Sequence, residues 1–239
     1  MTLGKSLRLR RIFANGRALI VDCAPLAGDR MGKVGLLARA GVDAVVLTPG
    51  MLDGVAEELA GLSAILRIDG GLRWTQQLLS VQAALEMGAE AVLVSVEVWG
   101  PGPSEGLERF GRVTEDARRL GMPVIAEITG EEWLDVARIG ADYGADVILA
   151  RVVPGQAADR HFVRVTGRPF LANLGEHPEA TLDLLAVIYE MMQGAAQGVV
   201  LRNRALVEGP MLRAIHGLVH QGISPEEALD IAQAPERAF

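Results

Sequence analysis

Short apolar runs alternate with longer amphipathic segments along the whole chain. The apolar runs contain mainly Val, Ile, Leu and Ala, and most of them end beside a polar residue or a turn. Runs of this kind are typical of buried parallel strands, whereas apolar residues every three or four positions indicate helices packed on a sheet. The clearest run lies in 144–153, GADVILARVV. We expect a strand there, with Leu149, Ala150 and Arg151 near its carboxyl end.

The pattern predicts eight strands separated by helices. The expected strands are 18–24, 44–47, 64–69, 91–98, 124–128, 144–153, 170–173 and 198–203. The expected helices are 31–40, 51–59, 74–87, 104–120, 131–143, 157–165, 180–193, 210–220 and 225–233. This alternation favours an α/β fold with a single (β/α)8 TIM barrel over residues 1–239, and an open doubly wound sheet is the alternative.

Composition narrows the class of protein. The chain is 50% hydrophobic and 22% charged, which fits an ordinary globular domain. Cys23 is its one cysteine, and no apolar run approaches the roughly 20 residues of a membrane-spanning helix, so we expect a cytoplasmic protein. The net charge is −7 and basic residues are scattered apart from 8–11. We therefore expect neither a nucleic-acid nor a membrane partner.

Polar residues gather at the carboxyl ends of the expected strands, where barrels place their active sites. If alternate residues point inward, this end carries Asp22, Thr48, Arg67 or Asp69, Ser95 or Glu97, Glu127, Arg151, Asn173 and Arg202. Guanidinium groups bind oxyanions, and carboxylates accept hydroxyl protons. We therefore expect a small-molecule ligand at the barrel mouth; the alternative is a polar rim whose charges pair with one another.

Glu127 is the candidate general acid or base. It lies between apolar neighbours, so burial would raise the pKa of its carboxyl group; the alternative is a wall residue paired with arginine. The other candidate catalytic acids are Asp22 and Asp69, and the candidate substrate-binding residues are Arg67, Glu97, Arg151, Asn173 and Arg202. Asp22, Asp69, Glu97 and Glu127 are possible ligands of a hard divalent cation, but no spacing motif supports this, so we expect no metal and no cofactor.

Two of the histidines, His216 and His220, are four residues apart on one expected helix. They lack the glutamate of a zinc-protease motif and lie on the last barrel helix, away from the mouth. We expect them at the surface or at a subunit interface.

Long segments resemble the archaeal-type class I fructose-bisphosphate aldolases and the wider DeoC/LacD aldolase superfamily. The segments include GVDAVVLTPG, SVQAALEMGAEAVLVSV, LGMPVIAEI, IGADYGADVILAR and LRNRALVEGPMLRAIHGLVHQGISPEEAL, and the similarity covers about residues 4–229. The resemblance implies a barrel, carbon–carbon bond chemistry of the lyase class, and a homo-oligomer.

The resemblance also implies a Schiff-base lysine on the sixth strand, where this chain has Leu149. An alkyl side chain cannot form an imine with a carbonyl substrate. The chain contains two lysines, Lys5 and Lys33, and neither lies at the end of an expected strand. Schiff-base aldol chemistry is therefore not expected.

Other family positions differ as well. The Asp-His-Gly motif that follows the first strand matches residues 24–26, Ala-Pro-Leu. The glycines of the phosphate site match Leu174, Gly175 and Leu201, and we expect the leucines to crowd the backbone amides that bind phosphate. These differences suggest a divergent lyase or isomerase acting on a small polar or anionic metabolite. The alternative is a non-catalytic pseudoenzyme that binds a metabolite or serves as an oligomeric scaffold.

Overall fold

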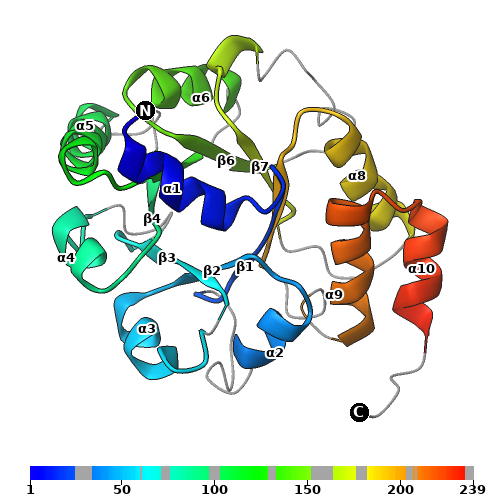
Figure 1. The fold of residues 1–239 in the computed structure, drawn as a ribbon. Helices are drawn as coiled ribbons and strands as arrows, with labels where there is room; N and C mark the ends of the chain where they lie inside the picture. The colour runs from blue at the N-terminus through cyan, green and yellow to red at the C-terminus, as the bar shows by residue number, and fades with distance from the viewer. Residues whose placement is uncertain are drawn as a thin grey trace.

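A closed barrel of eight parallel strands forms the centre of the molecule (Figure 1). It is seen in a computed structural model, which describes residues 1–24, 34–59, 61–70, 76–96, 103–128, 133–151, 164–175, 182–202, 207 and 209–234. The strands follow one another around the barrel in chain order. The predicted single (β/α)8 barrel is confirmed, and the open sheet is wrong.

The strands are β1 (Ala18–Asp22), β2 (Ala44–Leu47), β3 (Ser63–Arg67), β4 (Ala91–Val96), β5 (Val124–Ile128), β6 (Val147–Arg151), β7 (Phe170–Asn173) and β8 (Gly198–Leu201). The helices are α1 (Leu3–Ile12), α2 (Val34–Arg39), α3 (Pro49–Val55), α4 (Val81–Glu86), α5 (Pro103–Leu120), α6 (Trp133–Asp142), α8 (Leu182–Gln193), α9 (Gly209–His216) and α10 (Pro225–Gln233), and a π-helical turn, Gly217–Gln221, continues α9. Among the described residues, no helix combines the length and apolar character that a membrane crossing requires.

Helix α4 begins later than the sequence pattern predicts. The side chain of Ser80 accepts a hydrogen bond from the backbone N–H of Ala83 and caps the helix, so that Val81 is its first residue. Residues 76–80, which were expected to be helical, lie outside the helix. The expected helical residues 74–75 and 157–163 lie outside the described part of the chain.

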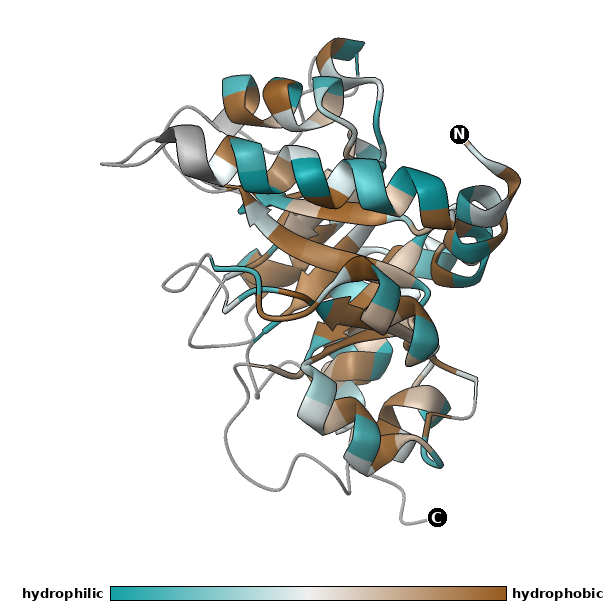
Figure 2. Ribbon diagram, turned by 90° about the vertical axis from the view of Figure 1, so that its left-hand side faces the viewer, coloured by the Kyte–Doolittle hydropathy of each residue, from teal (hydrophilic) through white to brown (hydrophobic). Residues whose placement is uncertain are grey.

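Strand alternation divides the core into two clusters. Side chains on one face of each strand fill the barrel interior, as Ile20, Ile65, Leu93, Ile125 and Leu149 do. Side chains on the opposite face pack against the surrounding helices. Figure 2 shows the consequence, with hydrophobic strands at the centre and hydrophilic faces on the outer helices. This two-residue period also decides which polar side chains reach the mouth.

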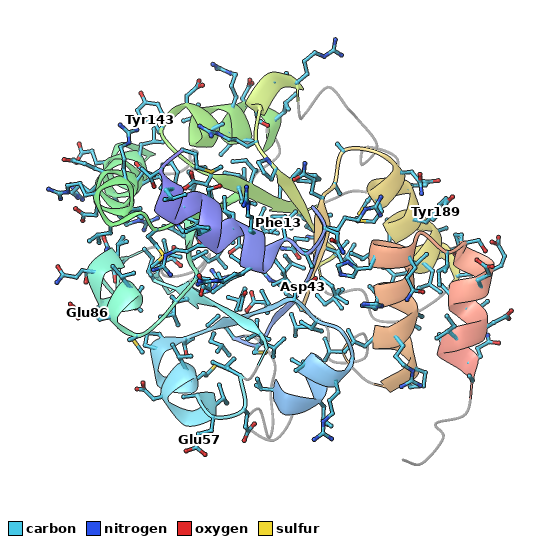
Figure 3. All side chains as sticks on the ribbon, viewed as in Figure 1. Phe13, Asp43, Glu57, Glu86, Tyr143 and Tyr189 are labelled. Carbon is cyan, nitrogen blue, oxygen red and sulfur yellow. The ribbon has the colours of Figure 1, made fainter. Side chains whose placement is uncertain are left out.

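Helix α1 crosses the end of the barrel that lies opposite the strand carboxyl ends (Figure 1). Ile12 is fully buried in the interior cluster, and Leu9 and Phe13 pack against the same cluster. Figure 3 places Phe13 over the barrel, whereas Glu57, Glu86 and Tyr143 lie on the outside. The apolar pattern did not predict this helix. It closes the bottom of the barrel, and the strand carboxyl ends form the opposite end, where barrel enzymes place their active sites.

Basic residues fasten α1 to the barrel. Nζ of Lys5 lies 2.6 Å from Oδ2 of Asp146, and both side chains are buried. Arg8 and Arg11 both bind the carboxylate of Glu90, just before β4. The basic N-terminal stretch therefore has a structural use in positioning α1.

His216 and His220 are partly buried, and their expected place at a subunit interface stays a prediction. Nε2 of His220 lies 2.9 Å from Oδ2 of Asp43, and the two imidazole rings are 4.8 Å apart. Burial and the neighbouring His220 lower the pKa of His216, although Asp43 opposes this. The contact between His220 and Asp43 holds the π-helical turn after α9 against the start of β2.

We expect Lys5→Met to lower the free energy of unfolding by about 3–5 kcal/mol, because it leaves the Asp146 carboxylate buried without its cation. Arg138→Met is the matched control, since Arg138 and Asp142 form an exposed pair at 3.6 Å. It should change stability by less than about 1 kcal/mol. Urea unfolding measures both effects, and equal losses would contradict a structural role for the buried pair.

Candidate active site

The carboxyl ends of the strands place a ring of polar side chains above the apolar interior. In β1, β3, β4 and β5 the inward positions beyond the apolar residues are Asp22, Arg67, Ser95 and Glu127, and Arg202 follows β8. Arg67 and Ser95 are the last inward residues of β3 and β4, and Asp69, two residues beyond Arg67, also reaches this ring. This ring lies opposite α1 and forms the mouth of the barrel.

Two arginines hold three carboxylates in a buried network. Arg67 donates through Nη1 to Oε2 of Glu127 at 2.9 Å and through Nη2 to Oδ2 of Asp22 at 3.2 Å. Its Nη1 also lies 3.6 Å from Oδ1 of Asp69. Arg202 donates through Nε to Oδ2 of Asp22 at 3.0 Å, and its Nη1 lies 2.5 Å from Oε1 of Glu127. Glu127 and Asp22 thus share both guanidinium groups.

Asp69 and Ser95 support the network from one side. Oδ2 of Asp69 accepts the backbone N–H of Ser95 at 2.6 Å, and the Ser95 hydroxyl lies within reach of Arg67. The buried side chain of Arg109, on α5, donates to the carbonyl oxygen of Ser95 at 2.6 Å. The sequence reading missed Arg109. Helical spacing could have indicated that Arg109 faces the barrel, because it lies four residues before the buried Val113 on the inward face of α5.

The pKa of Glu127 is lowered, which corrects the expected rise. Burial alone raises it, but the positive charges of Arg202 and Arg67, together with the hydrogen bond from Arg67, outweigh burial. The side chain is only 2% exposed, so these charges act with little screening by water. The pKa of Arg67 is raised, because the attraction of Glu127, Asp22 and Asp69 exceeds the opposing effect of burial. Glu127 in the free protein is therefore an ionised, arginine-paired carboxylate.

The remaining predicted site residues lie outside this network. Arg151, the last residue of β6, is exposed, and Asn173, its partner in the β6–β7 register, is buried. Oδ1 of Asn173 accepts the backbone N–H of Gly175 at 3.0 Å. Thr48 precedes α3 as its N-cap residue. Glu97 lies outside the described residues.

Leu149 lies in the apolar interior one layer below the mouth. It is 1% exposed, belongs to the interior cluster and is the register partner of Glu127. Lys5, on α1, forms an ion pair with Asp146 at the end of the barrel opposite the mouth. Lys33 lies outside the described residues. The described mouth thus presents arginines and carboxylates around Leu149.

The two leucines expected to crowd the anion site point elsewhere, and that expectation is wrong. Leu174 and Leu201 are both buried in the outer cluster between the strands and the helices. Strand alternation explains Leu201, because its neighbours Val200 and Arg202 face the interior and the mouth. Gly175 keeps a left-handed backbone with φ +66°. The rim beside β7 therefore stays free of these leucine side chains.

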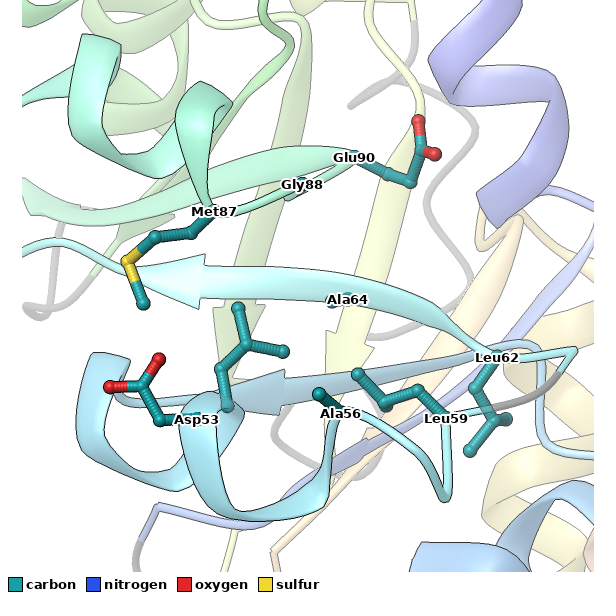
Figure 4. A pocket seen from close by; sticks show the side chains of 9 residues that line it. Asp53, Ala56, Leu59, Leu62, Ala64, Met87, Gly88 and Glu90 are labelled. Carbon is teal, nitrogen blue, oxygen red and sulfur yellow. The ribbon is translucent and has the colours of Figure 1, made fainter.

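A separate groove lies on the outside of the barrel, between α3, β3 and the end of α4 (Figure 4). Its volume is about 340 Å³, and its lining includes Leu59, Met87 and Asp53. It shares no residue with the mouth network. Within the described part of the chain, no group of three or more His, Cys, Asp or Glu residues is arranged to hold a metal ion.

Glu127→Gln should reduce the loss of stability in acid. The folded-state pKa of Glu127 lies below its ordinary value of 4.5, so the unfolded chain binds the proton more readily. Its contribution is therefore complete above about pH 4.5 and is lost as the pH falls through the folded-state pKa. Urea unfolding at pH 7 and pH 4 measures the change, with Glu108→Gln, an exposed acid near Arg112, as control. An unchanged acid dependence in Glu127→Gln would contradict the lowered pKa.

Comparisons with known proteins agree with this architecture. The family model described as DeoC/LacD family aldolase matches residues 29–201. The chain is 26% identical to 2-amino-3,7-dideoxy-D-threo-hept-6-ulosonate synthase 1 of Archaeoglobus fulgidus, over 95% of each chain. It is 27% identical to the corresponding synthase of Halobacterium salinarum, again over 95% of each chain.

Solved structures share the fold. A crystal structure of an archaeal fructose 1,6-bisphosphate aldolase matches with a TM-score of 0.74 and 21% identity, covering 91% of this chain and 100% of that chain. Fructose-bisphosphate aldolase from Slackia heliotrinireducens matches with a TM-score of 0.78 and 13% identity, covering 99% of this chain and 92% of that chain. The sequence match and the barrel lead to one assignment: the chain belongs to the DeoC/LacD aldolase family.

Proposed function

We propose that this protein is a lyase or isomerase that acts on a small polar or anionic metabolite without a Schiff-base lysine. The observation that carries the proposal is the buried network in which Glu127 and Asp22 share Arg67 and Arg202 at the barrel mouth. Barrel enzymes place their chemistry at this end of the strands. Leu149 lies in the apolar layer beneath, and its alkyl side chain cannot form an imine. We therefore propose chemistry that uses proton transfer and oxyanion binding instead.

Aldol cleavage needs a base for a hydroxyl proton and a group that stabilises the enolate oxygen. In our proposal Glu127 takes the hydroxyl proton, and the electrons of that O–H bond form the new carbonyl group. The carbon–carbon bond breaks, and its electron pair forms an enolate whose oxygen is bound by Arg202. Glu127 then returns the proton to the enolate carbon, so the reaction needs no further reactant. An isomerase would instead form its enolate when Glu127 removes a proton from the carbon next to a carbonyl group, and Arg202 would bind the enolate oxygen in the same way.

The lowered pKa of Glu127 is compatible with this role because it depends on the two arginines. A substrate oxygen that takes over the contact of Arg202 would weaken the attraction on the carboxylate and raise its pKa. In this proposal Asp22 holds both arginines in place, and Asp69 positions Arg67 and Ser95. Arg151, Asn173 and Glu97 stay candidate substrate-binding residues, and a cytoplasmic homo-oligomer stays a prediction.

A non-catalytic role is the second candidate. Glu127 and Asp22 form ion pairs with arginines in the free protein, as the charges of a purely structural rim would. The protein would then bind a metabolite or assemble as a scaffold. Turnover of a bound ligand separates the two candidates.

We expect at least one compound among fructose 1,6-bisphosphate, glycerol 3-phosphate, glycerate and pyruvate to raise the Tm, since a ligand of the native state stabilises it by mass action. The shift should disappear in Glu127→Gln and persist in Glu108→Gln. A shift that Glu127→Gln leaves intact would contradict the proposed site. Bound ligand without any carbonyl product would favour the non-catalytic role.

Borohydride reduction tests the absence of an imine. Imine formation releases water, and borohydride then adds two hydrogens to give a stable secondary amine, so a lysine nucleophile would gain the mass of the ligand less one oxygen atom. We expect no adduct by mass spectrometry after treatment with fructose 1,6-bisphosphate or pyruvate, because Leu149 cannot form one. An adduct mapped to Lys33 or Lys5 would overturn the proposed chemistry.

A further inference from the structure

Within the described residues three arginines lie at the mouth, and one of them differs from the other two. Arg67 and Arg202 are held by the carboxylates of Asp22, Asp69 and Glu127. Arg151 occupies an inward position of β6, two residues beyond Leu149, and its side chain is exposed. In the described part of the chain no carboxylate pairs with it. Its charge is thus available to a ligand.

The Arg151 side chain lies against the backbone that follows β7. Gly175 has φ +66°, and a Cβ placed on it would approach Nε of Arg151 to 3.3 Å. The backbone N–H of Gly175 is held by Asn173, whose backbone is the register partner of Arg151. Asn173 also pairs in register with Val200, two residues before Arg202. Arg151 and Arg202 therefore flank β7 at the same end of the barrel.

Two buried polar atoms of the network retain hydrogen-bonding capacity. Oε1 of Glu127 and Nη2 of Arg202 have no hydrogen-bond partner among the described residues. Both lie within ion-pair distance of an opposite charge, at 2.5 Å and 2.9 Å, but without hydrogen-bond geometry. Buried polar atoms are usually satisfied, so an unmatched donor next to an unmatched acceptor points to a missing group. A hydroxyl group suits the pair because it both donates and accepts.

We infer that Arg151 binds the oxyanion end of the ligand while a hydroxyl group of the same molecule bridges Glu127 and Arg202. The substrate class is a short hydroxylated compound with one carboxylate or phosphate group. This inference rests on the proposed function and adds a specificity-determining residue to it. A planar guanidinium makes two parallel hydrogen bonds to either oxyanion, which explains an arginine at this position.

Binding of glycerol, glycerate and glycerol 3-phosphate at constant ionic strength tests the inference, because the three probes share hydroxyl groups and differ at one end. Calorimetric titration of the wild type should give at least one anionic probe a Kd that is lower than the Kd of glycerol by about tenfold or more. Arg151→Gln should abolish that preference and leave glycerol binding unchanged. Arg39→Gln, an exposed arginine at the end of α2, is the matched control and should keep it.

The outcomes separate this inference from the proposed function. Anion preference that survives in Arg151→Gln, equal binding of all three probes, or no binding of any probe overturns the role of Arg151. In the first two cases the site itself stands if Glu127→Gln weakens binding of every probe. Which anionic probe binds more tightly distinguishes a carboxylate from a phosphate end.

Discussion

The burial of charge at the barrel mouth is the constraint on which the rest of the site depends. Asp22, Asp69 and Glu127 are at most 2% exposed at their side chains, so their charges receive little help from water. Each ionised carboxylate needs a guanidinium group nearby, because an uncompensated buried charge costs several kcal/mol. Oδ2 of Asp22 contacts both Arg67 and Arg202, and Glu127 does the same with its two oxygens. The side chains therefore fix one another, and the geometry of the mouth is shared among β1, β3, β5 and the end of β8.

Stability alone does not account for this arrangement. Apolar residues of similar size often replace a buried ion network without loss of stability, and the interior below the mouth is filled mainly by apolar side chains. The same barrel could have continued its apolar filling to the upper layer. Charged groups there instead give a rigid set of donors and acceptors, which is what a site needs to bind a polar ligand without reorganising. Arg109 and Asp69 extend this rigidity outward by fixing Ser95 from the helix layer and from β3.

The sequence predicts the barrel because each strand is short, apolar and bounded by turns. Strands 44–47, 124–128 and 170–173 have the expected bounds, since nothing in them competes with the period-two pattern. Helix α1 escapes prediction because its inward residues, Leu9 and Ile12, lie among basic ones that bind distant partners. The same limit applies to Glu127. The sign of its pKa change depends on Arg67, 60 residues away, and on the geometry of Arg202, neither of which local sequence reports. The outward direction of Leu201, in contrast, follows from strand alternation alone.

The two ends of the barrel use different cations, and this difference limits the chemistry. At the bottom, Lys5 is buried against Asp146 and holds α1 in place. At the described mouth the cations are arginines, and the pKa of Arg67 is raised further by its carboxylate neighbours. A lysine can lose its proton and become a nucleophile, whereas a guanidinium keeps its charge and binds oxyanions. A barrel of this family with arginines around Leu149 is thus suited to stabilising negative charge on a substrate oxygen. In the proposed reaction, proton transfer is assigned to the carboxylates that the same arginines hold.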